Sequence, residues 1–432
     1  MALKLQKKYY GKLILIGASV LTWLLILVLL NYYGYQETWE LWQVPTQRMS
    51  FMDFRLIPGS AESFAQGYEP SVENPFDPNE RIFNYPAFWR LFFYTGISQV
   101  DTVWISVSMI VLFFMGVFLF PKTLSVAGAI GMLLVIFSPA SMLLYERGNV
   151  DLVVFFICAM IVLAADYSSY VATSLIILGS IVKLFPIFGV SVLLKESKHK
   201  FWWLFAGCVL VFLAYVTATF SSVNASWKQT MRGDGISYGT NVFVTRYEKA
   251  ISKVFSEWFF SGQLGWLLKY GSLALALILL LVVVIRALRH TEQLELSTQR
   301  NLAAFRMGAA IYAGTFLLGN NWDYRLAFLV FIMPQLVEWT RSADMTYHKV
   351  VRVSILLVLL SCWHFWISHI PLVSIFNSAA DSTKFWIILD EVFNWALFAS
   401  LSYLLLASTP EWFKNQLRGL LPKWDLARSI QG

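Results

Sequence analysis

Long apolar runs separated by short polar turns dominate this chain. The first run covers residues 13–30, a largely polar stretch follows until about residue 100, and apolar runs then recur up to residue 407. Continuous apolar character over about 18 residues or more is typical of helices that cross a lipid bilayer. The pattern therefore predicts an all-α polytopic membrane protein.

The runs predict about twelve membrane segments. Segment 13–30 is too long for a secretory signal peptide and lacks a small-residue cleavage site, so we expect it to remain as the first span. Segments 170–183 and 186–194 are expected to form a hairpin broken at "KLFP" (183–186), since proline and the residue before it resist the helix. The other segments are expected at 102–120, 123–144, 152–166, 202–220, 267–286, 303–319, 324–340, 350–368 and 385–407.

Composition agrees with a membrane protein and excludes several other classes. The chain is 58% hydrophobic and only 14% charged, with a mean hydropathy of +0.61, whereas soluble domains have about 25% charged residues. Its cysteines, Cys158, Cys208 and Cys362, all lie in apolar runs, so neither a disulfide framework nor a zinc site is expected. No nucleic-acid partner is expected, because membrane orientation explains the net charge of +7 better.

Lysines and arginines predict which side of the membrane each loop faces. Four lysines precede the first span, and "KESKHK" (195–200) is basic, which places both on the cytoplasmic side. The stretch 32–100 carries eight acidic residues against four basic ones, which places it outside. We therefore expect one integral membrane domain over 1–432, with a first outer loop at 32–100, a second at 221–265 and a cytoplasmic tail at 408–432.

Asp53 is the first candidate for chemistry, because it lies in the expected first outer loop. A carboxylate there is suited to act as a general base toward a hydroxyl acceptor. A solvated aspartate that caps the following helix is the plainer alternative. Arg55 is suited either to hold a phosphate or to pair with Asp53.

The hexapeptide "ERGNVD", which starts at Glu146, places polar side chains between two apolar segments. One interpretation is a hydrogen-bonding surface in which Arg147 binds a phosphate or carboxylate while Asn149 and Asp151 bind hydroxyls. The other is a tight turn, with positive φ at Gly148 and Asn149 and with Asp151 as a helix N-cap. In that case Glu146 and Arg147 would be interfacial anchors.

Two more charged sites are expected at the outer ends of apolar segments. Lys183 stands at the break of the hairpin, where its partner is a lipid phosphate or a carboxylate such as Glu146 or Asp151, unless its side chain snorkels to the interface. Asp323 and Arg325 in "NNWDYR" are suited either to stabilise a developing phosphate charge or to form a surface ion pair beside aromatic belt residues.

Two remaining observations concern the membrane surface and bound groups. The stretch 86–98 is aromatic and amphipathic, which predicts a helix lying on the outer leaflet. The sequence holds no Gly-rich phosphate-binding loop, nucleotide-binding signature or metal-ligand spacing, so we expect neither a cofactor nor a metal.

Several short motifs follow one another on the expected outer side. They are Asp53, "GYEP" at 67–70, "NYP" at 84–86, "GNVD" at 148–151, "KLFP" at 183–186, and a looser segment with Asn241 and Arg246. With these motifs, over roughly residues 50–330, the chain resembles the GT-C superfamily of membrane glycosyltransferases. Within it, the chain resembles glycosyltransferase family 87, the polyprenol-phosphate-mannose-dependent mannosyltransferases. The family's His-containing outer segment near the later spans is not matched; "NNWDYR" is the candidate to stand in its place.

The resemblance implies a GT-C-like bundle and an inverting transfer from a polyprenyl-phosphate sugar. It implies that Asp53 deprotonates the acceptor hydroxyl. The cations expected to bind the donor phosphate are Lys183, Arg325, Arg147 and Arg246. The residues expected to bind substrate are Arg55, Asn84, Tyr85, Glu146, Asn149, Asp151, Asn241, Asp323 and Tyr324.

We therefore predict a hexosyltransferase, for mannose by the resemblance, that acts on a hydroxyl of a glycan or glycolipid. Its expected place is the bacterial inner membrane, with the active site on the extracytoplasmic side. A transporter or flippase of lipid-linked or small polar substrates is the alternative, since it would also use intramembrane charges and a broken helix. A non-catalytic assembly factor is a third hypothesis. The long first outer loop favours the enzyme.

Overall fold

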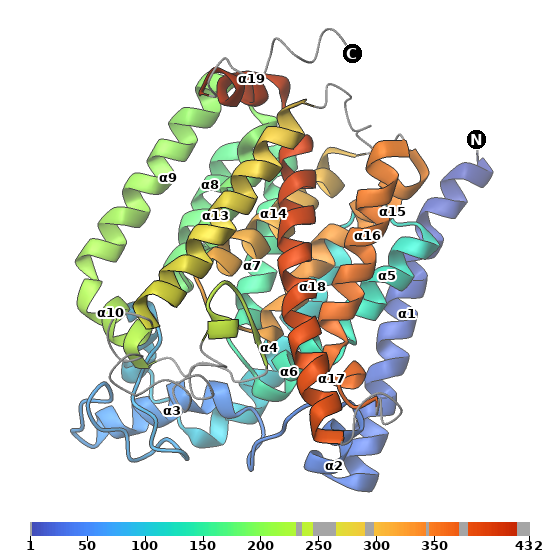
Figure 1. Cartoon of the computed structure of the whole chain (residues 1–432). Coiled ribbons are helices and arrows are strands. Elements are labelled where there is room, and N and C mark those ends of the chain that lie inside the picture. The colour runs from blue at the N-terminus through green and yellow to red at the C-terminus, as the bar shows by residue number, and fades with distance from the viewer. Residues whose placement is uncertain are drawn as a thin grey trace, which may run out of the picture.

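The computed structural model describes residues 2–229, 236–244, 265–289, 298–342, 345–370 and 379–420. Within them, helices make up almost all of the regular structure (Figure 1). The α-helices are α1 (Ala2–Tyr33), α2 (Tyr35–Leu41), α3 (Met52–Ala65), α4 (Thr102–Leu119), α5 (Val126–Ile136), α6 (Pro139–Arg147), α7 (Asp151–Tyr167), α8 (Ser169–Val182), α9 (Lys198–Ala218), α10 (Phe220–Gln229), α13 (Gly265–Arg289), α14 (Gln299–Leu317), α15 (Met333–Ser342), α16 (Met345–Cys362), α17 (His364–Ile367), α18 (Ala379–Ala407) and α19 (Glu411–Leu420).

Short 3-10 helices and one small β-ladder complete the described structure. The 3-10 helices are η1 (Ala87–Tyr94), η2 (Gln99–Asp101), η3 (Phe185–Lys195) and η5 (Asp323–Ile332), and the strands are β1 (Ser237–Tyr238) and β2 (Asn321–Trp322). The strands pair antiparallel, with Ser237 opposite Trp322 and Tyr238 opposite Asn321. This ladder ties the segment 236–244 to the turn that leads into η5.

The all-α class is confirmed, and each predicted apolar run coincides with one or more of these helices. Within the described residues, five helices are long and apolar enough to cross a membrane, or six if one bent pair counts as a single span. The five are Tyr10–Tyr33, Gln99–Leu119, Lys198–Ala218, Tyr270–Arg289 and Phe385–Ala407. The count of about twelve membrane segments stays a prediction.

The run 123–144, expected as one straight span, is instead the bent pair α5 and α6, whose axes differ by 53°. The first helix ends at Ile136, and Ser138 begins the second, because its hydroxyl accepts a hydrogen bond from the Ser141 N–H and Pro139 occupies the first turn of α6. The predicted break of 170–194 is confirmed. There α8 ends at Val182, Lys183 is extended with ψ of 133°, and η3 follows.

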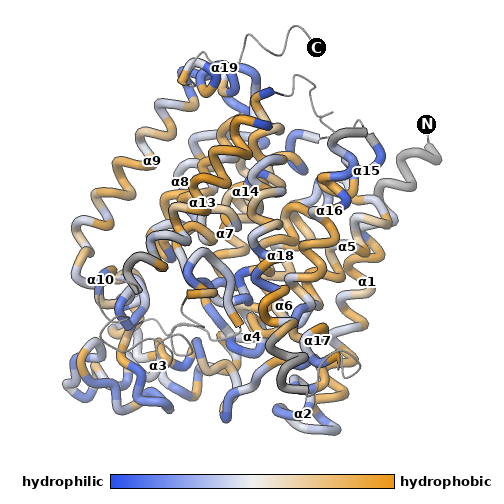
Figure 2. Tube along the Cα trace, viewed as in Figure 1, coloured by the Kyte–Doolittle hydropathy of each residue, from blue (hydrophilic) through white to orange (hydrophobic). Residues whose placement is uncertain are grey.

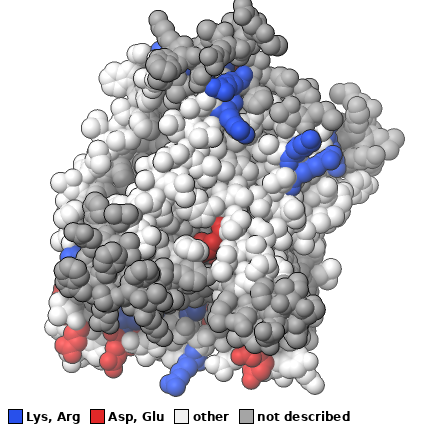
Figure 3. All heavy atoms as spheres, in the orientation of Figure 1, with Lys and Arg blue, Asp and Glu red and all other residues white. Residues whose placement is uncertain are grey.

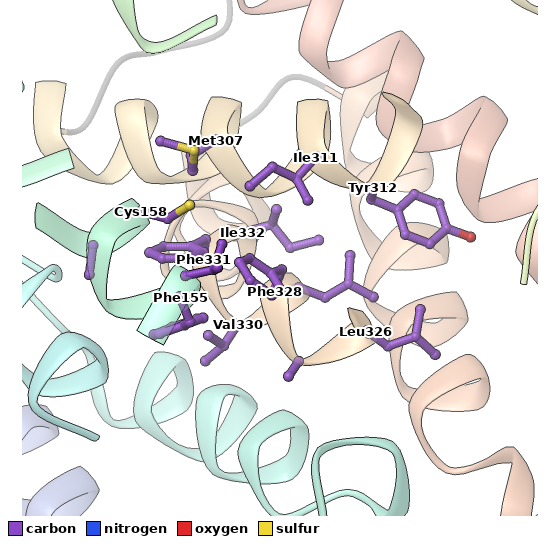
Figure 4. Packing of buried hydrophobic residues seen from close by; sticks show 14 of the residues in the cluster. Phe155, Cys158, Met307, Ile311, Tyr312, Leu326, Phe328, Val330, Phe331 and Ile332 are labelled. Atoms are coloured by element: carbon purple, nitrogen blue, oxygen red, sulfur yellow. The ribbon is translucent and has the colours of Figure 1, made fainter. Parts of the chain in front are cut away.

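Aromatic side chains in the centre of the bundle fix the helices that carry the polar residues. Phe155 of α7 stacks on Phe331 of η5 with ring centroids 4.4 Å apart, and Cys158 and Met307 lie beside them (Figure 4). All four side chains are buried. Such close packing leaves little freedom between elements, so α7 is held against the end of η5.

Polar residues gather at the two ends of the bundle. The tube coloured by hydropathy is apolar through the middle and polar at the end with α2 and α3 and at the end with α19 (Figure 2). On the face shown, Lys and Arg appear near α19 and α15, whereas the opposite end shows most of the Asp and Glu together with further Lys and Arg (Figure 3). The predicted orientation stays a prediction.

We predict that an exposed site in the 66–86 segment faces outward and that the α9 start faces the cytoplasm. Val72 is 77% exposed and Ser197 is exposed, while all three native cysteines are buried and give little background. In intact cells, Val72→Cys should react with a membrane-impermeant maleimide, and Ser197→Cys should react only after permeabilisation. Labelling of Ser197→Cys from outside would overturn the orientation.

Candidate active site

Asp53 lies in the first turn of α3, close to the end of α6. The residue that begins α3, Phe51, has a left-handed φ of 58°, and its N–H donates to the Glu146 carbonyl over 3.1 Å. The Asp53 carboxylate accepts a hydrogen bond of 2.8 Å from Asn149 Nδ2, and Arg81 Nη1 lies 3.9 Å away. Its side chain remains 23% exposed. The carboxylate is thus held in place and still open to solvent.

Asn149 joins Asp53 to the buried polar residues. Its Nδ2 also donates to the Tyr324 hydroxyl over 3.2 Å, and its Oδ1 accepts from Lys183 Nζ over 3.1 Å. The same oxygen accepts the backbone N–H of Asp151 over 3.0 Å. One amide therefore fixes four groups from α3, α7, η5 and the hairpin break.

Asp151 forms the centre of a buried ionic cluster. Its Oδ1 lies 2.6 Å from Lys183 Nζ, its Oδ2 lies 3.1 Å from Arg325 Nε, and its side chain is fully buried. The expected N-cap role of Asp151 is wrong: α7 begins at Asp151 itself, and the Asn149 side chain satisfies its free N–H. The carboxylate is therefore available to the two cations, and Asp151 is the partner that Lys183 required.

Tyr85 and Arg81 support Asp53 from the neighbouring segment. The Tyr85 hydroxyl donates to the Asp53 carbonyl over 3.4 Å, and Lys183 Nζ lies 5.7 Å from the centre of the Tyr85 ring. Burial, and after it the Asp53 charge, raises the pKa of Tyr85 well above its usual value, so the phenol stays a donor. Burial lowers the pKa of Arg81, but Asp77, bound through two nitrogens, outweighs it and the pKa is raised overall.

Glu146 and Arg147 lie inside the protein, so the alternative in which they are interfacial anchors is wrong. Arg147 Nε lies 3.1 Å from Glu146 Oε2, and Arg147 Nη2 donates to the Pro45 carbonyl over 3.2 Å. Glu146 Oε1 accepts from the Gln47 N–H and the Tyr35 hydroxyl, over 3.2 and 3.3 Å. Both residues thus fix the 42–51 segment against α6, because a buried carboxylate must be paired.

For two arginines, the alternative of an ion pair with a nearby aspartate is wrong. Arg55 does not pair with Asp53; it is buried, with Nε donating to the Ser50 carbonyl over 2.8 Å and Nη1 to Gln99 Oε1 over 3.1 Å. Asp323 and Arg325 are not a surface pair, since Asp323 is fully buried and Arg325 turns to Asp151. Residues two apart in a 3-10 helix point to different sides, because each turn holds three residues.

The remaining predicted site residues lie farther from this cluster or outside the described residues. Asn241 accepts from Ser272 of α13 over 3.2 Å, and its N–H donates to the Gly319 carbonyl. Asn84 is partly exposed next to Tyr85. Arg246 lies outside the described residues. The contacts thus join Asp53, Tyr85, Asn149, Asp151, Lys183, Tyr324 and Arg325 into one network.

Sequence reasoning missed two residues of this region, Arg81 and His364. His364 Nε2 lies 3.4 Å from Asp323 Oδ2, its Nδ1 lies 3.9 Å from Asp390 Oδ1, and the ring is buried. A histidine inside the apolar run 350–368 was a signal, since ionisable residues within such runs are functional candidates. Arg81 gave no comparable signal, because nothing in an exposed loop sequence indicates which carboxylate an arginine will meet.

The network has the parts of a group-transfer site. A half-buried carboxylate is suited to take a proton, and two cations that share one carboxylate leave an excess positive charge for an anionic group. Among the described residues, no group of three or more His, Cys, Asp and Glu is placed to hold a metal ion.

Comparison with known proteins gives one match. The model of glycosyltransferase family 87 matches residues 83–311, which is more than half of the chain. No curated protein and no solved structure matches it. The matched range contains Tyr85, Asn149, Asp151 and Lys183, while Asp53 lies before it. The place of Asp53 in the site therefore rests on its contacts.

We predict that Gly148→Ala lowers both stability and activity. Gly148 has a φ of 56°, and an added Cβ would lie 2.8 Å from Phe51 Cβ and 2.9 Å from Ser106 Oγ. The positive φ should cost about 1–2 kcal/mol, and the crowding a further 1–3 kcal/mol or so. Thermal unfolding in detergent measures both.

Gly96→Ala is the matched control. Gly96 also has a positive φ, 72°, but an added Cβ would meet nothing within 4 Å. It should show the conformational cost alone and retain activity, because nothing near Asp53 moves. Equal unfolding temperatures for the two variants would contradict the contact between Gly148 and Phe51.

Proposed function

The chain belongs to glycosyltransferase family 87, and from this premise we propose that it transfers a hexose, most favourably mannose, from a polyprenyl-phosphate sugar. The acceptor is a hydroxyl of a glycan or glycolipid at the outer face of the membrane. One observation carries the proposal: Asn149 joins the half-exposed Asp53 to the buried cluster of Lys183, Asp151 and Arg325. A proton acceptor and an anion site then lie side by side.

In the proposed reaction, Asp53 takes the proton of the acceptor hydroxyl. The hydroxyl oxygen forms a bond to the anomeric carbon from the face opposite the phosphate, so the configuration inverts. The bond between that carbon and the phosphate oxygen breaks, and polyprenyl phosphate leaves with the electron pair. Asn149 supports this role because its Nδ2 holds one Asp53 oxygen and leaves the other toward Arg81 and solvent.

Lys183 and Arg325 are the proposed partners of the leaving phosphate. Their two positive charges share the single negative charge of Asp151, so the cluster carries one net positive charge. The ammonium group of Lys183 has three donors, and two of them face Asp151 Oδ1 and Asn149 Oδ1. Its third donor is suited to a phosphate oxygen.

The other predicted residues take supporting parts in the proposal. Arg147 and Arg246 are further candidates for the donor phosphate. Arg55, Asn84, Tyr85, Glu146, Asn149, Asp151, Asn241, Asp323 and Tyr324 are the proposed surroundings of the substrates. For Arg55 and Glu146, burial and fixed partners favour a part in positioning the outer loop.

The proposed setting is a bacterial inner membrane with the site on its extracytoplasmic side. One membrane domain with about twelve segments would place 32–100 and 221–265 outside and 408–432 in the cytoplasm. The Lys and Arg residues near α19 and α15 support this orientation. Purified protein in liposomes, given a polyprenyl-phosphate mannose and hydroxyl acceptors, tests the activity, and absence of transfer with every donor and acceptor would favour a transporter.

We predict that Asp53→Asn abolishes most sugar transfer. The amide keeps the size of the side chain but cannot accept the proton, and loss of a general base typically costs about 10²–10⁴-fold in kcat. Donor KM should change little, because Lys183 and Arg325 remain. Glu73→Gln, in an exposed part of the same segment, is the control. Transfer within a few-fold of the parent would show that Asp53 is not the base.

Lys183→Gln should weaken donor binding or slow departure of the phosphate. Loss of one charge-assisted hydrogen bond of roughly 1.5–3 kcal/mol corresponds to about 10–100-fold in donor KM or kcat. The control is Lys122→Gln, because Lys122 is exposed and precedes α5, away from the outer segments. Unchanged donor kinetics in Lys183→Gln would remove this residue from the site.

A further inference from the structure

A cavity lies between α2, α17 and the start of α18. Its volume is about 470 Å³, and it is lined among others by Glu40, Gln43, His364, Phe365, Trp386 and Asp390. Pockets for small molecules measure about 300–1,000 Å³. The three elements lie together at the lower right in Figure 1. The cavity therefore has room for a small polar ligand at the outer end of the bundle.

This cavity and the Asp53 network share a wall. Pro45, which lines the cavity, accepts the hydrogen bond of Arg147 Nη2. On another side, His364 contacts Asp323, and the next residue, Tyr324, accepts from Asn149. Asn149 in turn holds Asp53. The cavity is thus linked to Asp53 through Asp323, Tyr324 and Asn149.

The charge of the cavity is opposite to that of the Lys183 cluster. It carries the carboxylates of Glu40 and Asp390 and the imidazoles of His364 and His369, and no Lys or Arg is among the described residues that line it. Carboxylates repel a phosphate in a partly buried site. The donor phosphate therefore does not belong in this cavity, whereas a group rich in hydroxyls does, since carboxylate and amide oxygens accept hydroxyl hydrogens.

The aromatic residues of the cavity are fixed in place. The Trp386 indole N–H donates to the Ile370 carbonyl over 3.0 Å, and the His364 Nδ1 lies 2.8 Å from the Ser361 carbonyl. Gln43 has a φ of 55°, a left-handed conformation uncommon for residues with a side chain. Such strain gathers at ligand sites. Rigid aromatic faces beside hydroxyl-binding groups suit a sugar ring, whose C–H faces are apolar and whose rim is polar.

We propose that this cavity binds a neutral sugar ring of the acceptor, next to the ring whose hydroxyl Asp53 would deprotonate. The inference rests on the proposed glycosyl transfer. It assigns the acceptor ring to Trp386 and Phe365 and the acceptor hydroxyls to Gln43, Glu40 and Asp390. Donor and acceptor then occupy places of opposite charge on the two sides of the Asn149 turn.

Saturation-transfer NMR on the full chain in nanodiscs tests the cavity without turnover. The probes are methyl α-mannoside, methyl phosphate and ethanolamine. The mannoside should receive saturation, and Trp386→Ala should reduce its signal at least severalfold. Trp104→Ala, which removes an exposed tryptophan at the outer end of α4, should leave it unchanged. Equal mannoside signals in Trp386→Ala and the parent, or binding of ethanolamine alone, would overturn the proposal.

Acceptor kinetics separate this inference from the proposed function. In Trp386→Ala, acceptor KM should rise about tenfold, the effect of losing one aromatic contact, while donor KM stays constant. Gln43→Asn, which tolerates the left-handed conformation, should raise acceptor KM alone as well. If both variants transfer sugar with an unchanged acceptor KM, the cavity does not bind the acceptor, and the proposed function is unaffected. If the mannoside binds in a Trp386-dependent way but no donor supports transfer, sugar binding in the cavity is supported and the proposed function is wrong.

Discussion

The buried carboxylate of Asp151 is the interaction on which the outer end of this protein depends. It is the first residue of α7, and it meets Lys183 at the break between α8 and η3 and Arg325 in η5. A fully buried carboxylate is tolerated only when cations and donors surround it. The positions of three segments far apart in the sequence are therefore linked, since removing one cation leaves an unpaired charge. The aromatic packing of Phe155 on Phe331 supports the same arrangement from the core side.

Asn149 extends this constraint to the segment that carries Asp53. Gly148 ends α6 with positive φ, and this places Asn149 where one amide meets Lys183 and Tyr324 as well as Asp53. Phe51 adopts a left-handed conformation to fit the same corner, and its N–H is held by Glu146. Asn149 and Glu146, which position this corner, are buried, while Asp53 itself is 23% exposed. A proton acceptor needs this combination, because it must be rigid and must still reach its substrate.

The sequence predicted much of the fold and part of the site. Apolar length located the helices, and the proline in "KLFP" located the broken hairpin, because both are local properties of the chain. The bend between α5 and α6 was missed, since Ser138 and Pro139 lie inside an otherwise apolar run and mark a helix start only once the first helix has ended. Pairing was least predictable: Asp151 finds its cations 32 and 174 residues away, as the numbering of Lys183 and Arg325 gives. No local pattern encodes such a separation.

Charge is distributed unevenly around the Asn149 turn, with the cations Lys183 and Arg325 on one side and the carboxylates Glu40 and Asp390 on the other. Under the proposed reaction, negative charge develops on the departing phosphate while a proton leaves the acceptor hydroxyl. Fixed cations near the first and carboxylates near the second stabilise both changes without reorganisation, provided that water is excluded around them. Reversing the two substrates would set a phosphate against Glu40 and Asp390 and an acceptor hydroxyl against Lys183 and Arg325. Under the proposed reaction, the buried cluster of Asp151, Lys183 and Arg325, which links three segments of the fold, would also fix the side on which the donor phosphate binds.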